Sequence, residues 1–403
     1  MNVFDDLIGQ DAAAAELSRA ARAAADVVAE RPIQPGAMTH AWLFTGPPGS
    51  GRSVAARALA AAVQCDRADE LTRGLGVPGC GDCRSCRAVR AGTHPDVRSL
   101  VPEGLSIGVG EIRAVVASSA RLPSLGRWQV VVIEDADRLT EGASNALLKA
   151  IEEPAARTLF LLCAPSTHPD DVMVTIRSRC RAVSLRIPPA TAVAAVLARE
   201  GVDEASACWA AQASQGHIGR ARRLAGDEQA RARREAVLAI PATLISLDAC
   251  FEAADHLVRA ADAEARAMTG ELDVAEADEL KVALGGGGTG KGAASASRGT
   301  IGALKELEKR QKSRLTRLQR DALDRALVDL ASFYRDVLLT QAGSTAPAAH
   351  PDFSGDVGLV ARSIDPAGAL QRLDQVLACR TAIDLNVKPK IAVEAMTAAL
   401  RLP

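Results

Sequence analysis

Residues 42–58, WLFTGPPGSGRSVAARA, leave few possible folds for the surrounding chain. An apolar run ends in a turn with three glycines, and an alanine-rich stretch that favours a helix follows directly. The order of strand, glycine-rich turn and helix predicts a phosphate-binding loop. The backbone N–H groups of such a loop converge on an anion, and the N-terminus of the helix adds a partial positive charge. A glycine-rich turn without a ligand is the alternative interpretation.

The residues expected to contact the phosphates are Gly46, Gly49, Gly51, Arg52 and Ser53. The Ser53 hydroxyl stands where this kind of loop ligates Mg²⁺. The same pattern has lysine after its last glycine, where this chain has Arg52. Arginine keeps the positive charge, but its planar guanidinium differs in shape from a compact ammonium group. We therefore expect phosphate binding, with ATP or ADP and Mg²⁺ as the candidate ligand, whereas the loop alone does not predict hydrolysis.

A second apolar strand carries acidic residues at its carboxyl end. The run WQVVVI, residues 128–133, is followed directly by Glu134 and Asp135. A continuous run of β-branched residues is typical of a strand inside a parallel sheet. In a chain with a phosphate-binding loop, carboxylates at this edge hold Mg²⁺ and position the attacking water. We expect both residues in the nucleotide site, although carboxylates without a ligand are also common at strand ends.

Strand-like and helix-like segments alternate up to about residue 187. Further strand-like runs lie at 97–101, 158–163 and 182–187, with helical segments between them. This alternation, together with the P-loop, predicts an α/β fold with a parallel sheet and helices on both faces. Beyond Pro188 the pattern is helical only.

These changes in pattern predict three domains. We expect a P-loop domain at 1–187, a small helical lid at 188–228 and an all-α domain at 229–403. The glycine- and serine-rich composition at 284–300 predicts a flexible linker inside the last domain.

Four of the nine cysteines are candidates for one metal site: Cys65, Cys80, Cys83 and Cys86. Two residues separate neighbouring cysteines in the motif CGDCRSC, and four thiolates suit a closed, structural zinc site. His94 is the alternative to Cys65 as the fourth ligand. An iron–sulfur site and unliganded thiols are the alternatives to zinc. We expect a zinc module over about residues 62–96, inserted into the P-loop domain.

Composition limits the classes of partner. The 48 basic and 49 acidic residues nearly balance, and aromatic residues make up 2% of the chain. We therefore expect neither general electrostatic attraction to nucleic acid or membranes nor binding of single strands by aromatic stacking. The first residues, MNVFDDLIGQ, do not resemble a signal peptide, and no apolar run reaches the length of a membrane span. The distribution of cysteines suits a reducing compartment, so we expect a cytoplasmic protein.

Several segments together resemble the AAA+ clamp loaders, most closely those of bacterial DNA polymerase III. The matching segments are FDDLIGQ at 4–10, GPPGSGRS at 46–53, the cysteine motif, VVVIEDADRLTEGASNALLKAIEEP at 130–154, RSRC at 177–180 and GHIGRARRL at 216–224. The resemblance covers residues 1 to about 225. It implies that the all-α region is the collar through which such subunits assemble.

The resemblance also implies roles for individual residues. In this family the arginine of the Ser-Arg-Cys motif is a finger that enters a neighbour's nucleotide site, which assigns that role to Arg179. Arg220 matches the sensor arginine of the helical lid. A hydrolysing member has lysine at position 52 and an Asp-Glu pair at 134 and 135, whereas this chain has Arg52 and the reversed pair Glu134-Asp135. We therefore expect its own ATPase activity to be weak or absent.

The predicted function is that of a clamp-loader subunit that supplies Arg179 in trans to a neighbouring ATPase. The expected partners are motor subunits of the gamma or tau type, a delta-type subunit, the sliding clamp and, through the assembly, primed DNA. Two other interpretations stay open: an ATP-hydrolysing motor subunit of the same family, and a zinc-containing nucleic-acid-binding module with an inactive P-loop. ATP turnover by the isolated chain favours the first, and salt-sensitive DNA binding favours the second.

Overall fold

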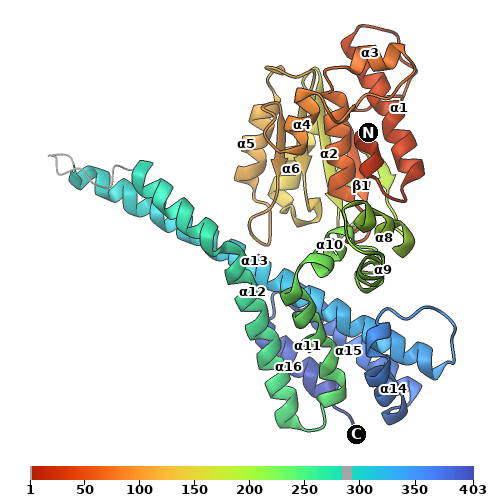
Figure 1. The fold of residues 1–403 in the computed structure, drawn as a ribbon. Helices are drawn as coiled ribbons and strands as arrows, with labels where there is room; N and C mark the ends of the chain where they lie inside the picture. The colour runs from red at the N-terminus through yellow and green to blue at the C-terminus, as the bar shows by residue number, and fades with distance from the viewer. Residues whose placement is uncertain (1, 284–292) are drawn as a thin grey trace. The chain divides into compact units, whose positions relative to one another are not determined.

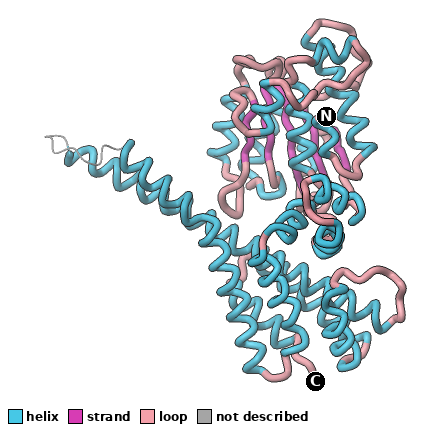
Figure 2. Tube along the Cα trace, in the orientation of Figure 1, coloured by secondary structure: helices cyan, strands magenta, loops and turns pink. Residues whose placement is uncertain are grey.

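A five-stranded parallel sheet lies at the centre of the first of two units into which the chain divides. The computed structural model describes residues 2–283 and 293–403. The first unit comprises Met1–Pro102 and Ser106–Arg222, and the second comprises Glu103–Leu105 and Arg223–Pro403. All strands of the described residues belong to the first unit (Figures 1 and 2).

The strands follow the spatial order β2-β3-β4-β1-β5. All neighbouring strands are parallel, and β1 lies between β4 and β5, with Ala41 beside Phe160. The carboxyl ends of the strands therefore meet at one edge of the sheet, where ligand sites of open α/β sheets lie. The strand bounds are β1 Ala41–Thr45, β2 Val97–Leu100, β3 Gln129–Ile133, β4 Thr158–Ala164 and β5 Arg181–Ser184.

Helices cover both faces of the sheet because strand side chains alternate between two apolar cores. Trp42 and Phe44 belong to the core with α1 and α2, whereas Leu43 belongs to the core with α5 and α6. The predicted α/β fold with a flanked parallel sheet is therefore confirmed. The bounds of these helices are α1 Asp11–Val28, α2 Arg52–Val63, α5 Val109–Ser119 and α6 Glu141–Glu152.

Shorter elements surround the sheet, and three helices follow β5. The three helices, α8 to α10, lie within the segment 188–228 that was expected to be a helical lid. A separate lid domain stays a prediction, since the first unit continues to Arg222. The bounds are η1 Val3–Asp6, α3 Ala68–Arg73, α4 Arg84–Arg90, η2 Ala136–Arg138, α7 Val174–Arg177, α8 Ala190–Arg199, α9 Glu204–Ala213 and α10 Ile218–Gly226.

A buried carboxylate fixes the chain between α5 and β3. Asp96 is 1% exposed, and its two oxygens accept hydrogen bonds from three successive backbone N–H groups, residues 124–126, at 2.6–2.8 Å. The Ser124 hydroxyl and the Gln129 side-chain amide donate to it as well. Burial opposes ionisation, but these hydrogen bonds outweigh it and lower the pKa of Asp96 to about 2. Asp96 therefore holds the start of β2 against the loop that precedes β3.

Among the described residues, the second unit consists of helices and the loops that connect them (Figure 2). Its core takes buried residues from every helix from α11 to α16, and Phe333 and Tyr334 at its centre are fully buried. The predicted all-α region is therefore confirmed. The bounds are α11 Glu228–Thr243, α12 Leu247–Ala283, α13 Ala293–Gln341, η3 Pro351–Phe353, α14 Ser354–Ser363, α15 Pro366–Asp384 and α16 Pro389–Ala399.

The prediction of a linker at 284–300 is wrong for its second part. Residues 284–292 lie outside the described residues, but α13 begins at Ala293. Alanine has the highest helix propensity of all residues, so the alanines of this segment extend the helix that continues to Gln341. Residues 293–300 are therefore helical.

A buried ion pair holds the segment before α14 in the second unit. Arg234 is 5% exposed, and its guanidinium donates to both Asp352 carboxylate oxygens at 2.6 and 3.1 Å. The same guanidinium contacts Nδ1 of His350 at 2.9 Å. Burial lowers the pKa of His350. The positive charge in this cluster therefore belongs to the arginine.

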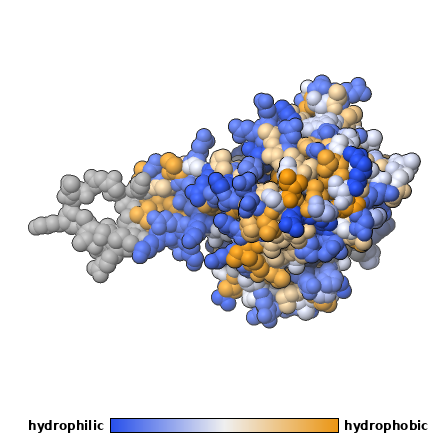
Figure 3. All heavy atoms as spheres, turned by 90° about the horizontal axis from the view of Figure 1, so that it is seen from below, coloured by the Kyte–Doolittle hydropathy of each residue, from blue (hydrophilic) through white to orange (hydrophobic). Residues whose placement is uncertain are grey.

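Apolar side chains are also found on the surface. Figure 3 shows exposed hydrophobic atoms in separate patches among hydrophilic ones on one face of the molecule. Exposed examples on α12 are Phe251, Met268 and Leu272. None of the helices in the described ranges combines the length and the apolar character that crossing a membrane requires.

Candidate nucleotide, metal and arginine-finger sites

The glycine-rich turn connects β1 to α2 at the carboxyl edge of the sheet (Figure 1). Its glycines adopt left-handed conformations, with φ of +86° at Gly49 and +92° at Gly51. A side chain at Gly49 would also collide with the helical segment after β5, since its Cβ would lie 2.7 Å from the Cβ of His217. Glycine at these positions lets the backbone N–H groups face an anion at the N-terminus of α2.

The first turn of α2 and the end of β3 contact each other. The Ser53 hydroxyl donates to the Glu134 carboxylate at 2.9 Å, and Arg57 lies 4.0 Å from the same carboxylate. In Arg52, the guanidinium nitrogen Nη1 is buried and has no hydrogen-bond partner among the described residues. A buried donor without an acceptor suits a phosphate oxygen, and the hydroxyl–carboxylate pair suits Mg²⁺. These residues fit a magnesium-bound nucleotide.

The acidic edge continues beyond Glu134. Asp135 has a positive φ of 51°, a conformation that few residues other than glycine adopt. Burial, and then the charge of Asp135, raise the pKa of Asp137. Burial, and then the charge of Glu134, raise the pKa of Cys163 to about 12, so this neighbouring side chain is a neutral thiol. Because these carboxylates disfavour one another's ionisation, a bound cation would stabilise their charged forms.

A cavity of about 810 Å³ opens beside the phosphate loop, inside the first unit. This volume lies in the ordinary range for small-molecule sites, about 300–1,000 Å³. Among the predicted residues, Gly49, Gly51, Arg52 and Ser53 line it. Arg220 is not among the lining residues, and its predicted sensor role therefore receives no support from the cavity.

Residues outside the predicted set supply much of the cavity wall. They include His217, Gly219 and Arg222 from the segment after β5. Arg222 pairs with Glu200, and its hydrogen bond lowers the pKa of that carboxyl. His217 and Arg222 both lie in the GHIGRARRL motif, but their direction toward the cavity depends on how α10 packs and is not encoded in their spacing.

The four predicted cysteines meet in one cluster, with their sulfur atoms all within 4.8 Å of one another. The Cys65 and Cys80 sulfur atoms are 3.8 Å apart. Tetrahedral coordination with metal–sulfur bonds of about 2.3 Å separates two sulfur atoms by about 3.8 Å. The backbone N–H of Cys83 donates to the Cys80 sulfur, and that of Cys86 donates to the Cys83 sulfur, which favours thiolates. The cluster can hold a metal ion.

The metal cluster does not include His94, the alternative ligand. Its Nδ1 instead accepts a hydrogen bond from the backbone N–H of Asp96 at 3.2 Å. Asp66, directly after Cys65, accepts hydrogen bonds from the backbone and hydroxyl of Ser85. These contacts join Cys65, at the end of α2, to the CGDCRSC segment, despite the long gap between them in the sequence.

Arg179 lies outside the cavity of its own chain. Its neighbours Ile176 and Cys180 pack into the core that contains α6, whereas the Arg179 side chain is 40% exposed. The guanidinium contacts Glu152 at 2.7 Å and the backbone oxygen of Thr175 at 3.0 Å. A rigid backbone thus presents an accessible cation at the surface of the first unit.

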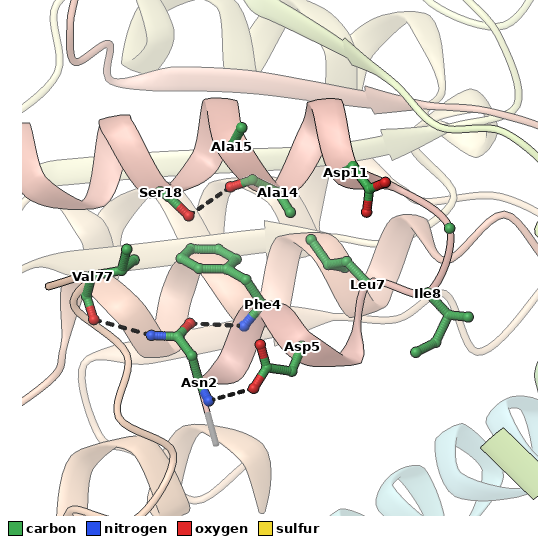
Figure 4. A pocket seen from close by; sticks show the side chains of 11 residues that line it. Asn2, Phe4, Asp5, Leu7, Ile8, Asp11, Ala14, Ala15, Ser18 and Val77 are labelled. Atoms are coloured by element: carbon green, nitrogen blue, oxygen red, sulfur yellow. Dashed lines mark hydrogen bonds between the residues drawn. The ribbon is translucent and has the colours of Figure 1, made fainter. Parts of the chain in front are cut away.

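A second hollow of about 620 Å³ lies beside the N-terminal segment, between η1 and α1 (Figure 4). The Asn2 side chain accepts a hydrogen bond from the backbone N–H of Phe4 and donates to the backbone oxygen of Val77. Gln10, which follows this segment, donates to the backbone oxygen of Ser50 in the phosphate loop at 3.2 Å. The residue that follows the N-terminal segment therefore stabilises the phosphate loop through this hydrogen bond.

Part of the chain is similar to known proteins. Residues 24–189 match the family described as DNA polymerase III, delta subunit. The delta-prime subunit of Escherichia coli (strain K12) is 38% identical over 169 residues, which cover 41% of this chain and 48% of that protein. Over this part of its length the chain is similar to the delta-prime clamp-loader subunits. The resemblance inferred from the sequence motifs is confirmed.

A DNA polymerase III subunit of another name also matches part of this chain. The tau subunit of DNA polymerase III from Bacillus subtilis (strain 168) is 32% identical over 180 residues, covering 44% of this chain and 28% of that protein. The chain spans about half the length of the delta-prime relatives that it matches.

Solved structures are more distant. A gamma subunit-related protein of DNA polymerase III from Thermotoga maritima has 15% identity and a TM-score of 0.38, covering 95% of this chain and 98% of that one. The P216G mutant of RuvB from the same organism has 20% identity and a TM-score of 0.38, covering 63% of this chain and 72% of that one. The fold assignment therefore rests on the sheet order and the flanking helices.

Proposed function

We propose that this chain is a clamp-loader subunit that donates Arg179 to the nucleotide site of a neighbouring subunit. The finger would stabilise negative charge on the γ-phosphate while the neighbour hydrolyses ATP. The proposed partners are motor subunits of the gamma or tau type, a delta-type subunit, the sliding clamp and, through the assembly, primed DNA. The match of residues 24–189 to the DNA polymerase III delta subunit family and the similarity to delta-prime subunits support this assignment.

The position of Arg179 carries the proposal. Its guanidinium is accessible and lies outside the cavity that the chain's own phosphate loop lines. An arginine in that position is suited to a site on another molecule. Its planar set of N–H donors matches phosphate oxygens, and arginine fingers in other NTPases raise rates by about 10³–10⁵.

The chain's own site is proposed to bind ATP or ADP with Mg²⁺ and to hydrolyse ATP slowly or not at all. Arg52 replaces the lysine that contacts the transferred phosphate, and the reversed Glu134-Asp135 pair changes the distances to metal and water. The Ser53 contact with Glu134 supports a shared role of these two residues at Mg²⁺. ATP turnover by the isolated chain would favour a motor subunit instead.

The metal at the four cysteines is proposed to be a structural zinc ion. The ligand set is all thiolate and leaves no position for a substrate, as in structural zinc sites. The ion would join the end of α2, through Cys65, to the start of α4, through Cys83 and Cys86.

The test is ATP turnover by the reconstituted assembly with clamp and primed DNA, with either the unmodified chain or its Arg179→Ala variant. We expect a loss of about a thousandfold or more in turnover at the neighbouring site, on the scale of other arginine fingers. Arg177→Ala is the matched control, because Arg177 lies two residues before Arg179, at the end of α7, and among the described residues its side chain has one recorded contact, with the backbone oxygen of Thr167. Equal turnover with the Arg179→Ala and Arg177→Ala variants would refute the finger.

A further inference from the structure

The guanidinium of Arg179 is held by one carboxylate. The Arg179 Nη2 atom lies 2.7 Å from Oε1 of Glu152. Nη1 donates to the backbone oxygen of Thr175 and to the Ser178 hydroxyl, at 3.0 and 3.2 Å. The Thr175 and Ser178 contacts are local to the turn that carries Arg179, whereas Glu152 belongs to a different helix.

Glu152 occupies a rigid position. It is the last residue of α6, and the preceding residue, Ile151, is fully buried in the core beneath α6. The backbone oxygen of Ile151 lies 2.7 Å from the ring nitrogen Nε2 of His40, at the start of β1. Pro154 ends the helix two residues later. The carboxylate is therefore attached to a backbone that is fixed on both sides.

We propose that Glu152 is a positioning residue for the arginine finger. Arginine has a long side chain with many rotamers, and an unrestrained one loses this freedom when it binds a phosphate. A partner that selects one orientation beforehand reduces this loss, and preorganised charges are the more effective ones in catalysis. The inference rests on the finger role proposed above and extends it to a second residue.

The contact with Glu152 leaves donors for a phosphate. A guanidinium has five N–H groups, and the recorded hydrogen bonds of Arg179 use both hydrogens of Nη1, while Nη2 forms the ion pair with Glu152. Within the described part of the chain, the Nε hydrogen and the second Nη2 hydrogen have no acceptor. Glu152 therefore orients the guanidinium without occupying all of it.

The experiment measures kcat and KM for ATP in the reconstituted assembly with Glu152→Ala, Arg179→Ala and the double variant. An exposed ion pair corresponds to a factor of roughly two to five, and we expect Glu152→Ala to lower kcat about threefold or more with KM for ATP unchanged. Glu152→Gln keeps an oxygen acceptor and should retain more activity than Glu152→Ala. In the Arg179→Ala background, Glu152→Ala should have no further effect, because Glu152 acts through the arginine.

Glu153→Ala is the matched control, since Glu153 is the exposed neighbouring glutamate and has no ion pair among the described residues. Equal midpoints of thermal unfolding for Glu152→Ala and Glu153→Ala would exclude a purely structural effect of the Glu152 substitution. Unchanged or increased kcat in Glu152→Ala, together with a large loss in Arg179→Ala, would overturn the positioning role and leave the finger intact. An additive effect in the double variant would also overturn it. No loss in Arg179→Ala would overturn both the finger and its positioning residue.

Discussion

Replacing Asp96 by asparagine should destabilise the first unit strongly while hardly changing the size of the side chain. One carboxylate oxygen of Asp96 accepts the backbone N–H groups of Leu125 and Gly126, and the other accepts Ser124 and Gln129 donors. An asparagine has one oxygen and one NH₂ group, so the NH₂ group must face buried donors. Whichever way the amide turns, at least two N–H groups lose their acceptor.

The size of the effect follows from two separate arguments. Each buried donor left without an acceptor costs about 1–3 kcal/mol, so two of them cost about 2–6 kcal/mol. The pKa of Asp96 is lowered from 3.8 to about 2. At about 1.4 kcal/mol for each pKa unit, this shift corresponds to about 2.5 kcal/mol of stabilisation by the ionised form. We therefore expect Asp96→Asn to lower the free energy of unfolding by about 3 kcal/mol.

Tryptophan fluorescence during urea unfolding reports on the unfolding of the first unit, which contains Asp96. All three tryptophans, Trp42, Trp128 and Trp209, belong to the first unit. Asp203→Asn is the control, because Asp203 accepts the backbone N–H of Ser206 at a helix N-cap, where asparagine performs as well as aspartate. A loss below about 1 kcal/mol in Asp96→Asn, or an equal loss in the control, would refute the reasoning.

The same carboxylate predicts a pH dependence with a definite sign. Because the pKa is lower in the folded protein than in the unfolded one, the stabilisation is complete above the unfolded pKa of 3.8 and disappears as the pH falls through about 2. The stability difference between the unmodified chain and Asp96→Asn should thus be constant near neutral pH and shrink below pH 3.8. A difference that grows as the pH falls would contradict the assigned direction.

Two further predictions concern the cysteine cluster and the second unit. Cys83→Ser should reduce the zinc content of the purified protein and lower the unfolding midpoint detected by tryptophan fluorescence. Cys208→Ser, at an exposed thiol, should change neither quantity. Full zinc content in Cys83→Ser would contradict the proposed ligand set. Asp352→Ala should leave the charge of Arg234 buried without its carboxylate and lower the stability of the second unit by about 3–5 kcal/mol, measured by hydrogen exchange in α14. Asp352→Leu combined with Arg234→Met should recover most of this loss.

Features encoded in neighbouring residues could be predicted from the sequence. The phosphate loop, the strand before it and the helix after it lie within about twenty consecutive residues. The run of β-branched residues before Glu134 predicts a strand from composition alone. The CGDCRSC motif likewise contains three of the four clustered cysteines. Each of these signals depends on spacing along the chain, so no knowledge of the packing is needed.

Features that depend on contacts between distant residues could not be predicted. His217 packs against Gly49, Asp96 binds the loop before β3, and Glu152 reaches Arg179 only in the folded chain. The predicted sensor, Arg220, illustrates the same limit, because its place in a motif does not fix which α10 side chains line the cavity. At residues 293–300 the glycine- and serine-rich composition predicts a linker, but the segment also contains alanine, which favours helix, and α13 begins at Ala293.

The strand order has a consequence for synthesis on the ribosome. β1, which leads into the phosphate loop, pairs only with β4 and β5, and its partner residues follow more than a hundred positions later. Such long-range pairing makes folding slow, because the connecting chain must be ordered before the contacts form. The phosphate loop therefore cannot reach its final conformation until β5 has emerged, and the nascent chain exposes the apolar β1 for that interval. This interval is when the first unit is most exposed to aggregation.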